Sequence, residues 1–216
     1  MTTQQLITGL VLAGGRGTRM GGIDKGLQTF QGKPLALHAL ERLQPQVASC
    51  VINANRHIDV YQSWGVDVIS DAAEGDQVAY EGPLAGFAAG LQHCHTPWIL
   101  TVACDSPCFP SDLAMRMLGT AEQSGKLIVM AAGPEMEESA EHLGAIRSQP
   151  TFCLIHQSLR KSLNDFVQAG GRKIDRWTSQ HQAILETFDK PHDDPWAFAN
   201  ANTLAQLQQL ERLQRP

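Results

Sequence analysis

The chain has 216 residues, of which 43% are hydrophobic and 18% are charged, and its formal net charge at pH 7 is −5. The length suits one large domain or one and a half, and the composition is typical of a globular protein with a substantial buried core. The acidic balance argues against nucleic acid or an anionic membrane as a partner, because binding to either needs a net basic face.

The N-terminal residues predict a protein that stays in the cytoplasm. Residues 1–5 lack the basic stretch of a signal peptide, and the apolar run after them has only the length of a strand. No stretch of the sequence approaches the roughly 20 apolar residues of a membrane span. We therefore expect a cytoplasmic location and no membrane partner.

The first predicted strand, at residues 9–12, leads into a glycine-rich loop that ends near Lys25. This loop holds five glycines, two arginines and a lysine. Glycines let a backbone approach a ligand closely and adopt positive φ, so successive N–H groups can converge on an anion. A polyphosphate is the ligand that best fits such a loop.

Two better-known phosphate-binding motifs do not match this loop. The dinucleotide fingerprint G-x-G-x-x-G, aligned on Gly15 and Gly17, would place its third glycine at Met20. The P-loop pattern requires a glycine before its lysine and a hydroxyl residue after it. Lys25 is instead preceded by an aspartate and followed by a glycine. The loop therefore belongs to a third type.

Polar side chains end the next two predicted strands. After a helix predicted at 34–43, a strand at 50–55 contains Asn53 near its end, and Asp71 directly follows a strand predicted at 66–70. Open α/β sheets bind their ligands at the carboxyl ends of the strands. Asn53 and Asp71 are therefore candidate nucleotide contacts.

Two further candidates follow along the chain. Gly82, Pro83 and Leu84 open a predicted helix, whose first N–H groups can bind an anion or a base edge. The apolar strand predicted at 98–104 ends at Asp105. A carboxylate at that edge is the ligand that Mg²⁺ requires when it also binds substrate phosphates. The alternative is that Asp105 only begins a turn before a proline.

The second half of the chain continues the alternation of helices and strands. We predict helices at 111–125 and 157–169, strands at 127–131 and 183–188, and a final helix capped by Thr203 and Gln206. Between them lie an acidic loop at 134–138 and short strand-like pieces around 145–146 and 151–155. These predict a small β element that covers the ligand site from the side of a second, acceptor substrate.

This order of elements predicts an α/β fold with a doubly wound, mostly parallel sheet. The glycine-rich loop, Asn53, Asp71 and Asp105 would then lie together at one edge of the sheet. The five cysteines have no framework spacing, which favours buried reduced thiols. A zinc site is the alternative, built from His93, Cys94, His95, Cys104 and Cys108, but no C-x-x-C or H-x-x-x-H pair supports it.

Residues 12–25, which read LAGGRGTRMGGIDK, resemble the signature of nucleotidyltransferases that transfer NMP from an NTP and release pyrophosphate. The second half of this motif is similar to that of the molybdenum cofactor guanylyltransferases in particular. The resemblance covers essentially the whole chain. Its other specific parts are residues 53–56, 82–86, 104–107, 149–151 and 200–203.

The resemblance implies a Rossmann-like nucleotidyltransferase domain over residues 1–216, with a nucleotide-binding half at about 1–110 and an acceptor-binding half at about 111–216. It implies GTP, Mg²⁺ and molybdenum-molybdopterin as partners, and transfer of GMP to the terminal phosphate of that pterin. Other molybdenum cofactor biosynthesis proteins and apo-molybdoenzymes are further expected partners.

Specific residues are implicated in nucleotide binding. By position in the family's motifs, these are Leu12, Ala13, Gly14, Lys25, Asn53, Asp71 and Asp105, with Asp105 also holding the metal. The glycine-rich loop and the helix start add Gly15, Gly82, Pro83 and Leu84. Guanine would be read by Asp71 or by main-chain groups of residues 82–84.

The expected chemistry relies on positioning and charge neutralisation, because the acceptor phosphate is already an anionic nucleophile. Lys25 and Arg19, with the N–H groups of residues 14–17, would stabilise the departing pyrophosphate, and Asp105 would hold Mg²⁺ against the phosphates. Because molybdopterin is polyanionic, Arg147, Arg172 and Lys173 are candidate acceptor contacts, or else solvated surface charges.

Three other functions remain open on the sequence. The same loop could transfer CMP instead of GMP to the pterin, since it binds phosphates and not bases. A sugar-phosphate nucleotidyltransferase is a further possibility. The chain could also be a regulatory nucleotide-binding module without turnover, although the presence of both Lys25 and Asp105 argues against this.

Overall fold

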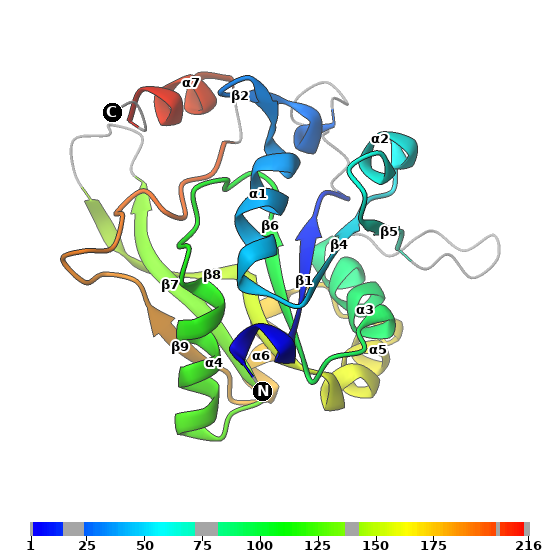
Figure 1. Cartoon of the computed structure of the whole chain (residues 1–216). Coiled ribbons are helices and arrows are strands. Elements are labelled where there is room, and N and C mark those ends of the chain that lie inside the picture. The colour runs from blue at the N-terminus through cyan, green and yellow to red at the C-terminus, as the bar shows by residue number, and fades with distance from the viewer. Residues whose placement is uncertain (1, 15–23, 72–81, 137–142, 202–203, 214–216) are drawn as a thin grey trace.

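The computed structural model describes residues 2–14, 24–71, 82–136, 143–201 and 204–213. Its centre is a seven-stranded sheet in the order β5-β4-β1-β6-β8-β7-β9 (Figure 1). The strands are β1 (Ile7–Leu12), β4 (Ser49–Asn53), β5 (Asp67–Ile69), β6 (Trp98–Ala103), β7 (Ile128–Met136), β8 (Leu143–His156) and β9 (Ile184–Thr187). β1, β4, β5 and β6 are parallel, whereas β8 is antiparallel to β6 and β7, and β9 is parallel to β7. The predicted α/β class with a mostly parallel sheet is confirmed.

Helices cover both faces of this sheet (Figure 1). α1 (Leu35–Leu43) and α4 (Leu113–Ser124) share one hydrophobic core with the sheet, and α3 (Pro83–His93), α5 (Arg160–Gln168) and α6 (Ile174–Gln180) share the other. The remaining elements are α2 (Ile58–Gln62), α7 (Leu204–Leu213), the short 3-10 helices η1 (Thr3–Leu6), η3 (Lys25–Leu27), η4 (Gln44–Gln46) and η5 (Gln157–Leu159), and a hairpin of β2 (Thr29–Phe30) and β3 (Lys33–Pro34).

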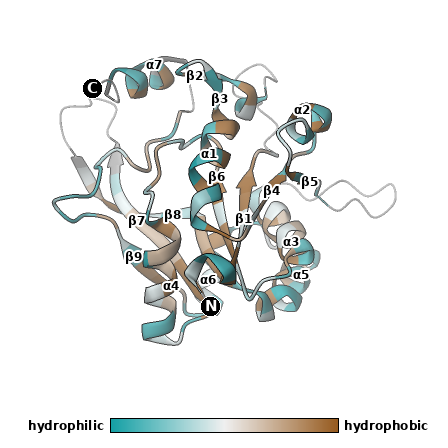
Figure 2. Cartoon of the chain, in the orientation of Figure 1, coloured by the Kyte–Doolittle hydropathy of each residue, from teal (hydrophilic) through white to brown (hydrophobic). Residues whose placement is uncertain are grey.

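Burial on both faces of the sheet explains why the central strands are continuous apolar runs in the sequence. In β1 every residue but Leu12 is buried. Because successive side chains of a strand point to opposite faces, Leu10 joins the core under α3 and Val11 joins the core under α1. A parallel strand covered on both faces reads as a continuous apolar run. Figure 2 shows the hydrophobic colour concentrated on these strands.

The part of the sheet after Gly133 differs from the prediction. The acidic loop expected from Pro134 is, up to Met136, the end of β7, and the two short pieces expected around 145–146 and 151–155 are one strand, β8. β7 pairs Met130 with Cys153 but the next residue, Ala131, with Gln149, so residues 150–152 form a bulge. The residues at 147–150 are not apolar and separate the two apolar pieces, so the sequence predicted two short strands where the structure has one.

The prediction missed one helix, α6, and the structure does not test one predicted helix cap. α6 was not predicted, because it has only seven residues and just two buried apolar side chains, Ile174 and Trp177, which are too few to establish a helical period. The final helix is confirmed as α7, but the predicted capping residue Thr203 lies outside the described residues. The division into a nucleotide-binding and an acceptor-binding half stays a prediction.

Candidate active site

The carboxyl ends of β1, β4, β5 and β6 lie at one edge of the sheet because these strands are parallel. Gly14, Asn53, Asp71 and Asp105 come at or just after these ends, as the sequence predicted. Asn53 and Asp71 are joined by a hydrogen bond, and Asp105 is paired with Lys25.

Lys25 and Asp105 form an ion pair at this edge. The Lys25 Nζ lies 2.7 Å from the Asp105 Oδ2, and the two side chains are 25% and 19% exposed. Asp105 lies two residues after the end of β6, and Lys25 is the first residue of η3. A cation therefore already lies against this carboxylate, in a place that solvent and a ligand can reach.

Asp71 accepts hydrogen bonds from two asparagines. Asn53 Nδ2 donates to Asp71 Oδ1 at 3.0 Å, and Asn55 Nδ2 donates to Asp71 Oδ2 at 2.8 Å. The Asp71 N–H donates in return to Asn55 Oδ1 at 2.9 Å. These bonds hold the carboxylate in one orientation across the ends of β4 and β5. Asn55 was not predicted as a site residue, although it follows the same strand end.

Two glycines make room for Asn53. A Cβ on Gly86 would lie 2.6 Å from Asn53 Oδ1, and a Cβ on Gly14 would lie 2.9 Å from the same atom. Both distances are shorter than a contact that real side chains allow. Glycine is therefore required at both positions if the Asn53 amide is to keep its place beside Asp71.

The main chain of Asp105 is fixed by the segment before α7. The Ala201 N–H donates to the Asp105 carbonyl at 2.8 Å, and the Ser106 hydroxyl hydrogen-bonds Asn200 Oδ1 at 2.6 Å. Ser106 is fully buried. These residues belong to motifs seen in the sequence, yet only the structure shows that residues near both the middle and the end of the chain support Asp105.

Some of the residues predicted to contact the nucleotide already use their polar groups in hydrogen bonds within the protein, or are buried. The Ala13 N–H donates to the Asn53 carbonyl at 2.8 Å, and the Leu12 carbonyl accepts from Cys104 N–H at 3.2 Å. Leu84 is 1% exposed. Pro83 has no N–H to offer. A nucleotide that contacts residues 12–13 and 82–84 would therefore use main-chain groups that have no hydrogen bond described above, or van der Waals contacts with exposed atoms. It would not use the buried Leu84 side chain.

For five other predicted site residues the structure does not decide whether they bind a substrate. Gly15 and Arg19 lie outside the described residues. Arg147 lies on β8 opposite Gly133, while Arg172 Nη1 donates to the Val167 carbonyl at 2.9 Å near the end of α5. Lys173 is exposed and precedes α6. The three proposed acceptor contacts thus come from β8 and from the connection between α5 and α6, and their role stays a prediction.

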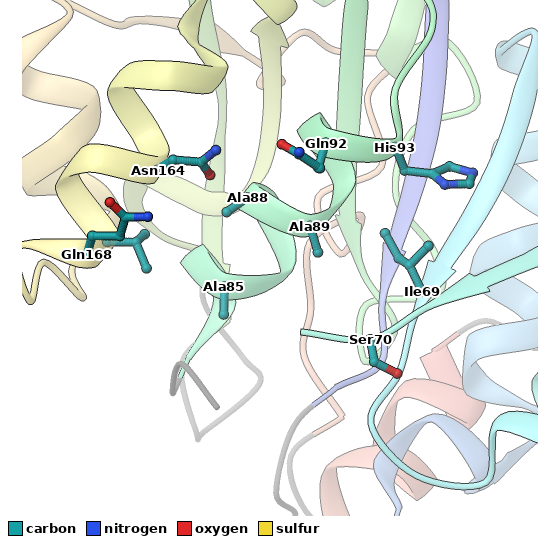
Figure 3. Close-up of a pocket in the computed structure, with 10 residues that line it drawn as sticks. Ile69, Ser70, Ala85, Ala88, Ala89, Gln92, His93, Asn164 and Gln168 are labelled. Atoms are coloured by element: carbon teal, nitrogen blue, oxygen red, sulfur yellow. The ribbon is translucent and has the colours of Figure 1, made fainter. Parts of the chain in front are cut away.

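A cavity of about 400 Å³ lies beside this edge, between β5, α3 and α5 (Figure 3). Its walls include Ile69, Ser70 and several alanines of α3, and the amides of Gln92 and Asn164 approach each other across it (Figure 3). None of the predicted site residues lines this cavity. The ion pair of Lys25 and Asp105 therefore marks a different place from the cavity.

The five cysteines are buried free thiols, in agreement with the prediction. Burial, with the charge of the neighbouring Asp105, raises the pKa of Cys104, so its thiol stays neutral and is no nucleophile. Within the described residues, no three His, Cys, Asp or Glu side chains come together as a metal site. Nor is any helix of this part of the chain long and apolar enough to span a bilayer.

Known proteins resemble the chain in sequence and in fold. Residues 9–187 match the family described as the MobA-like NTP transferase domain. The molybdenum cofactor guanylyltransferase of Acidovorax ebreus is 57% identical over 207 residues, which is 96% of each chain. The structure of molybdopterin-guanine dinucleotide biosynthesis protein A from Archaeoglobus fulgidus has a TM-score of 0.71 at 21% identity and covers 95% of this chain and 97% of its own. A 4-diphosphocytidyl-2C-methyl-D-erythritol synthase from Anaerococcus prevotii has a TM-score of 0.70 at 10% identity, with 98% and 97% covered.

Proposed function

Since the chain belongs to the MobA-like NTP transferase family, we propose that it transfers GMP from GTP to the terminal phosphate of molybdenum-molybdopterin and releases pyrophosphate. The product is the molybdopterin guanine dinucleotide cofactor. The enzyme is a nucleotidyltransferase of molybdenum cofactor biosynthesis. Apo-molybdoenzymes and other proteins of cofactor biosynthesis are its proposed partners, and the cytoplasm is its proposed location.

The observation that carries this proposal is the ion pair of Lys25 and Asp105, at the edge where four parallel strands end. A cation and a carboxylate 2.7 Å apart, both partly exposed, are suited to bind a polyphosphate together with its metal. A guanylyltransferase relative that is 57% identical over almost the full length makes GTP the nucleotide of choice.

Asp105 is the proposed ligand of Mg²⁺. Its carboxylate is partly exposed and lies against a cation in this structure, the Lys25 ammonium, so its surroundings fit a positive charge. Mg²⁺ commonly uses one or two protein carboxylates and completes its shell with water and phosphate oxygens. A single carboxylate at this edge is therefore sufficient. When bound, the metal would supply charge neutralisation at the phosphates.

The protein's own part in the reaction is to bind and to orient. The acceptor phosphate is already anionic, so no side chain needs to remove a proton from it. The Lys25 ammonium can neutralise charge that builds on the departing pyrophosphate, assisted by the N–H of Gly14 and by Arg19. The new bond joins the acceptor phosphate oxygen to the α-phosphorus of GTP, and the bond from that phosphorus to pyrophosphate breaks.

Asp71 is the proposed reader of guanine. The guanine edge offers N1–H and an amino group as donors, and a carboxylate accepts both. Asn53 and Asn55 hold the Asp71 carboxylate in one orientation, which would preserve this pattern when the base is absent. A pyrimidine such as cytosine lacks the paired donors of guanine in that arrangement.

Transfer of CMP to the same pterin is the second candidate, because the pair of Lys25 and Asp105 would bind the phosphates of a nucleotide and does not distinguish its base. A regulatory module without turnover is the third candidate, and the pairing of Lys25 with Asp105 argues against it.

Thermal shifts and pyrophosphate release separate these candidates. The purified protein is heated with GTP, CTP, ATP or UTP, with and without Mg²⁺, because a ligand that binds only the folded state raises Tm. Pyrophosphate is then measured with molybdopterin added. We expect a Mg²⁺-enhanced shift selective for GTP, with release that depends on the pterin. A shift selective for CTP would favour cytidylyl transfer, and binding without release would favour a regulatory module.

A further inference from the structure

Asp24 is a buried acidic residue next to Lys25. It is only 6% exposed. Its Oδ1 accepts hydrogen bonds from the Tyr61 hydroxyl at 2.9 Å and from the Gly26 N–H at 3.1 Å. A buried carboxylate is stable only when such donors replace its lost water. The Tyr61 hydroxyl is therefore part of what keeps Asp24 in place.

Tyr61 reaches Asp24 from a different element. It lies on α2, is fully buried, and packs edge to face on Trp64 with ring centroids 5.1 Å apart. Burial, followed by the charge and the hydrogen bond of Asp24, raises the pKa of Tyr61 well above its ordinary value. Its hydroxyl thus stays protonated and acts as the donor.

The turn that carries Lys25 is enclosed on several sides. A Cβ on Gly26 would overlap the Tyr61 hydroxyl and would lie 3.1 Å from the Ala36 Cβ and 3.4 Å from the Ala13 Cβ. Residue 26 therefore packs between α2, α1 and the end of β1. Asp24 caps the same turn through the Gly26 N–H. The main chain from which Lys25 projects toward Asp105 is fixed by these contacts.

We propose that Tyr61 is a positioning residue for Lys25. Through its hydrogen bond to Asp24, it fixes the turn so that the Lys25 ammonium lies over the phosphates of the nucleotide and against Asp105. The inference rests on the proposed function, in which Lys25 neutralises the departing pyrophosphate. Tyr61 itself is fully buried, and it belongs to none of the sequence motifs of the site.

The test is a double-mutant cycle on GMP transfer. Wild type, Tyr61→Phe, Lys25→Ala and the double variant are compared, in single-turnover reactions with enzyme in excess where rates are low. A displacement of about 1 Å in a positioned group can cost about 10²-fold in rate. We expect Tyr61→Phe to lower kcat about tenfold or more with a smaller change in KM for GTP. In the Lys25→Ala background Tyr61→Phe should lower kcat no further, because Tyr61 acts only by positioning the Lys25 ammonium, which that background lacks.

Thr120→Val is the matched control. The Thr120 hydroxyl also donates to a carboxylate, Glu186 Oε2, at 2.6 Å, but between α4 and β9. It should lower Tm and leave kcat within about twofold of wild type, which separates a loss of stability from a loss of positioning. Gly26→Ala is a second variant of the same contact, because its Cβ displaces the Tyr61 hydroxyl, and it should lower kcat in the same way.

Two results would overturn the inference. One is a wild-type kcat in Tyr61→Phe, and the other is an equal loss in the presence and absence of Lys25. Failure of the proposed function looks different, because in that case the wild-type protein itself transfers no GMP. Normal transfer by wild type together with full activity of Tyr61→Phe rejects the positioning role and leaves guanylyl transfer intact.

Discussion

At the scale of single residues, Lys25 and Asp105 are 80 positions apart in the chain and meet at 2.7 Å. Each was predicted separately, one from a glycine-rich loop and the other from the end of an apolar strand. Their pairing follows from the parallel sheet, since both segments leave its carboxyl edge. Asp24 and Tyr61 show the limit of the same reasoning, because a hydrogen bond between a loop and a distant helix leaves no period or motif in the sequence.

Replacing Asp105 with Asn tests the proposed metal ligand. The change keeps the side chain's shape but removes the charge that faces Lys25. We expect a fall in kcat of about 10²-fold or more, which is the scale for one preorganised electrostatic group. Tm should change little, because the Ala201 N–H still binds the main chain at residue 105. Steady-state kinetics across a Mg²⁺ titration measure the effect.

Glu41→Gln is the control for that change. Glu41 pairs with Lys33 at 2.7 Å, but the two side chains are 46% and 50% exposed, and exposed pairs contribute little. This variant should keep wild-type kinetics. Retention of more than a tenth of wild-type turnover by Asp105→Asn would contradict the role of Asp105.

Gly86→Ala tests the packing that places Asn53. The new Cβ would lie 2.6 Å from Asn53 Oδ1 and 2.9 Å from Leu12 Cδ2, so the amide must move away from Asp71. We expect the Kd for GTP to rise about tenfold or more, since a misplaced polar group leaves its partner unpaired. Calorimetric titration with GTP measures this change.

Gly119→Ala, in α4, is the matched control, because nothing lies within 4 Å of the Cβ that it would gain. Alanine in the middle of a helix is more stable than glycine by about 0.5–1 kcal/mol, so Tm should rise slightly. Its Kd for GTP should stay that of wild type. Equal GTP affinities of the Gly86 and Gly119 variants would show that the Asn53 amide does not matter for binding.

At the scale of elements, the bulge in β8 is the feature that could not be predicted from the sequence. Thr101 of β6 is fully buried, and its hydroxyl donates to the Thr151 carbonyl at 2.8 Å while it accepts from the Cys153 N–H at 3.1 Å. β6 pairs with β8 only up to Leu100. Beyond this point β8 no longer pairs with β6, whereas its pairing with β7 continues to Met136.

Thr101→Val removes the hydroxyl at this point and keeps the side chain's shape. Leaving buried main-chain groups without a partner costs about 1–3 kcal/mol, so the free energy of unfolding should fall by that amount. If the outer part of β7 and β8 binds the acceptor, KM for molybdopterin should rise several-fold, and KM for GTP should not change. Denaturant titration and two-substrate kinetics measure the two effects.

Thr178→Val gives the comparison for that experiment. The Thr178 hydroxyl is also buried and donates to the Ile174 carbonyl at 3.1 Å, within α6. This variant should lose stability and keep both KM values. A rise in KM for GTP in Thr101→Val, or no rise for the pterin, would be evidence against an acceptor surface on β7 and β8.

At the scale of the whole molecule, Arg116 connects α4 to the chain between β9 and α7. Its guanidinium lies 2.7 Å from Asp193 Oδ1, 3.0 Å from Glu186 Oε1 and 3.8 Å from the ring centroid of Phe188. The side chains of Arg116 and Asp193 are 9% and 6% exposed. Arg116 therefore stabilises the part of the chain between β9 and α7.

Asp193→Asn tests this connection through its pH dependence. Burial by itself would raise the pKa of Asp193, but hydrogen bonds from Arg116 and from the Lys190 N–H, with the Arg116 charge, lower it below the ordinary value of 3.8. A carboxyl with a lowered pKa in the folded state stabilises the fold above its unfolded pKa, and this contribution is lost as the pH falls through the folded pKa.

Asp193→Asn should therefore be less stable than wild type at pH 7, by about 2 kcal/mol for a hydrogen bond between charged groups. The difference should shrink below about pH 4, where the wild-type carboxyl takes up its proton. Denaturant titrations of both proteins from pH 7 to pH 3 measure it. A difference that is constant over this range would mean that the charge of Asp193 does not contribute.

The sequence predicted the order of helices and strands, the parallel arrangement and the edge at which Asn53, Asp71 and Asp105 lie, because burial on both faces and strand ends leave local patterns. It did not predict the length of β8, the helix α6 or the support from Ser106, Asn200 and Arg116. These depend on contacts between segments far apart in the chain, which the composition of a single window does not contain.

The most direct measurement follows the α-phosphate. The purified protein is incubated with Mg²⁺, molybdenum-molybdopterin and GTP labelled at the α-phosphorus, and the label and pyrophosphate are both quantified. We predict that label enters the pterin in a one-to-one ratio with pyrophosphate released, and that labelled CTP does not replace GTP. Label that stays in GTP, leaves as free GMP, or enters the pterin only from CTP would contradict guanylyl transfer.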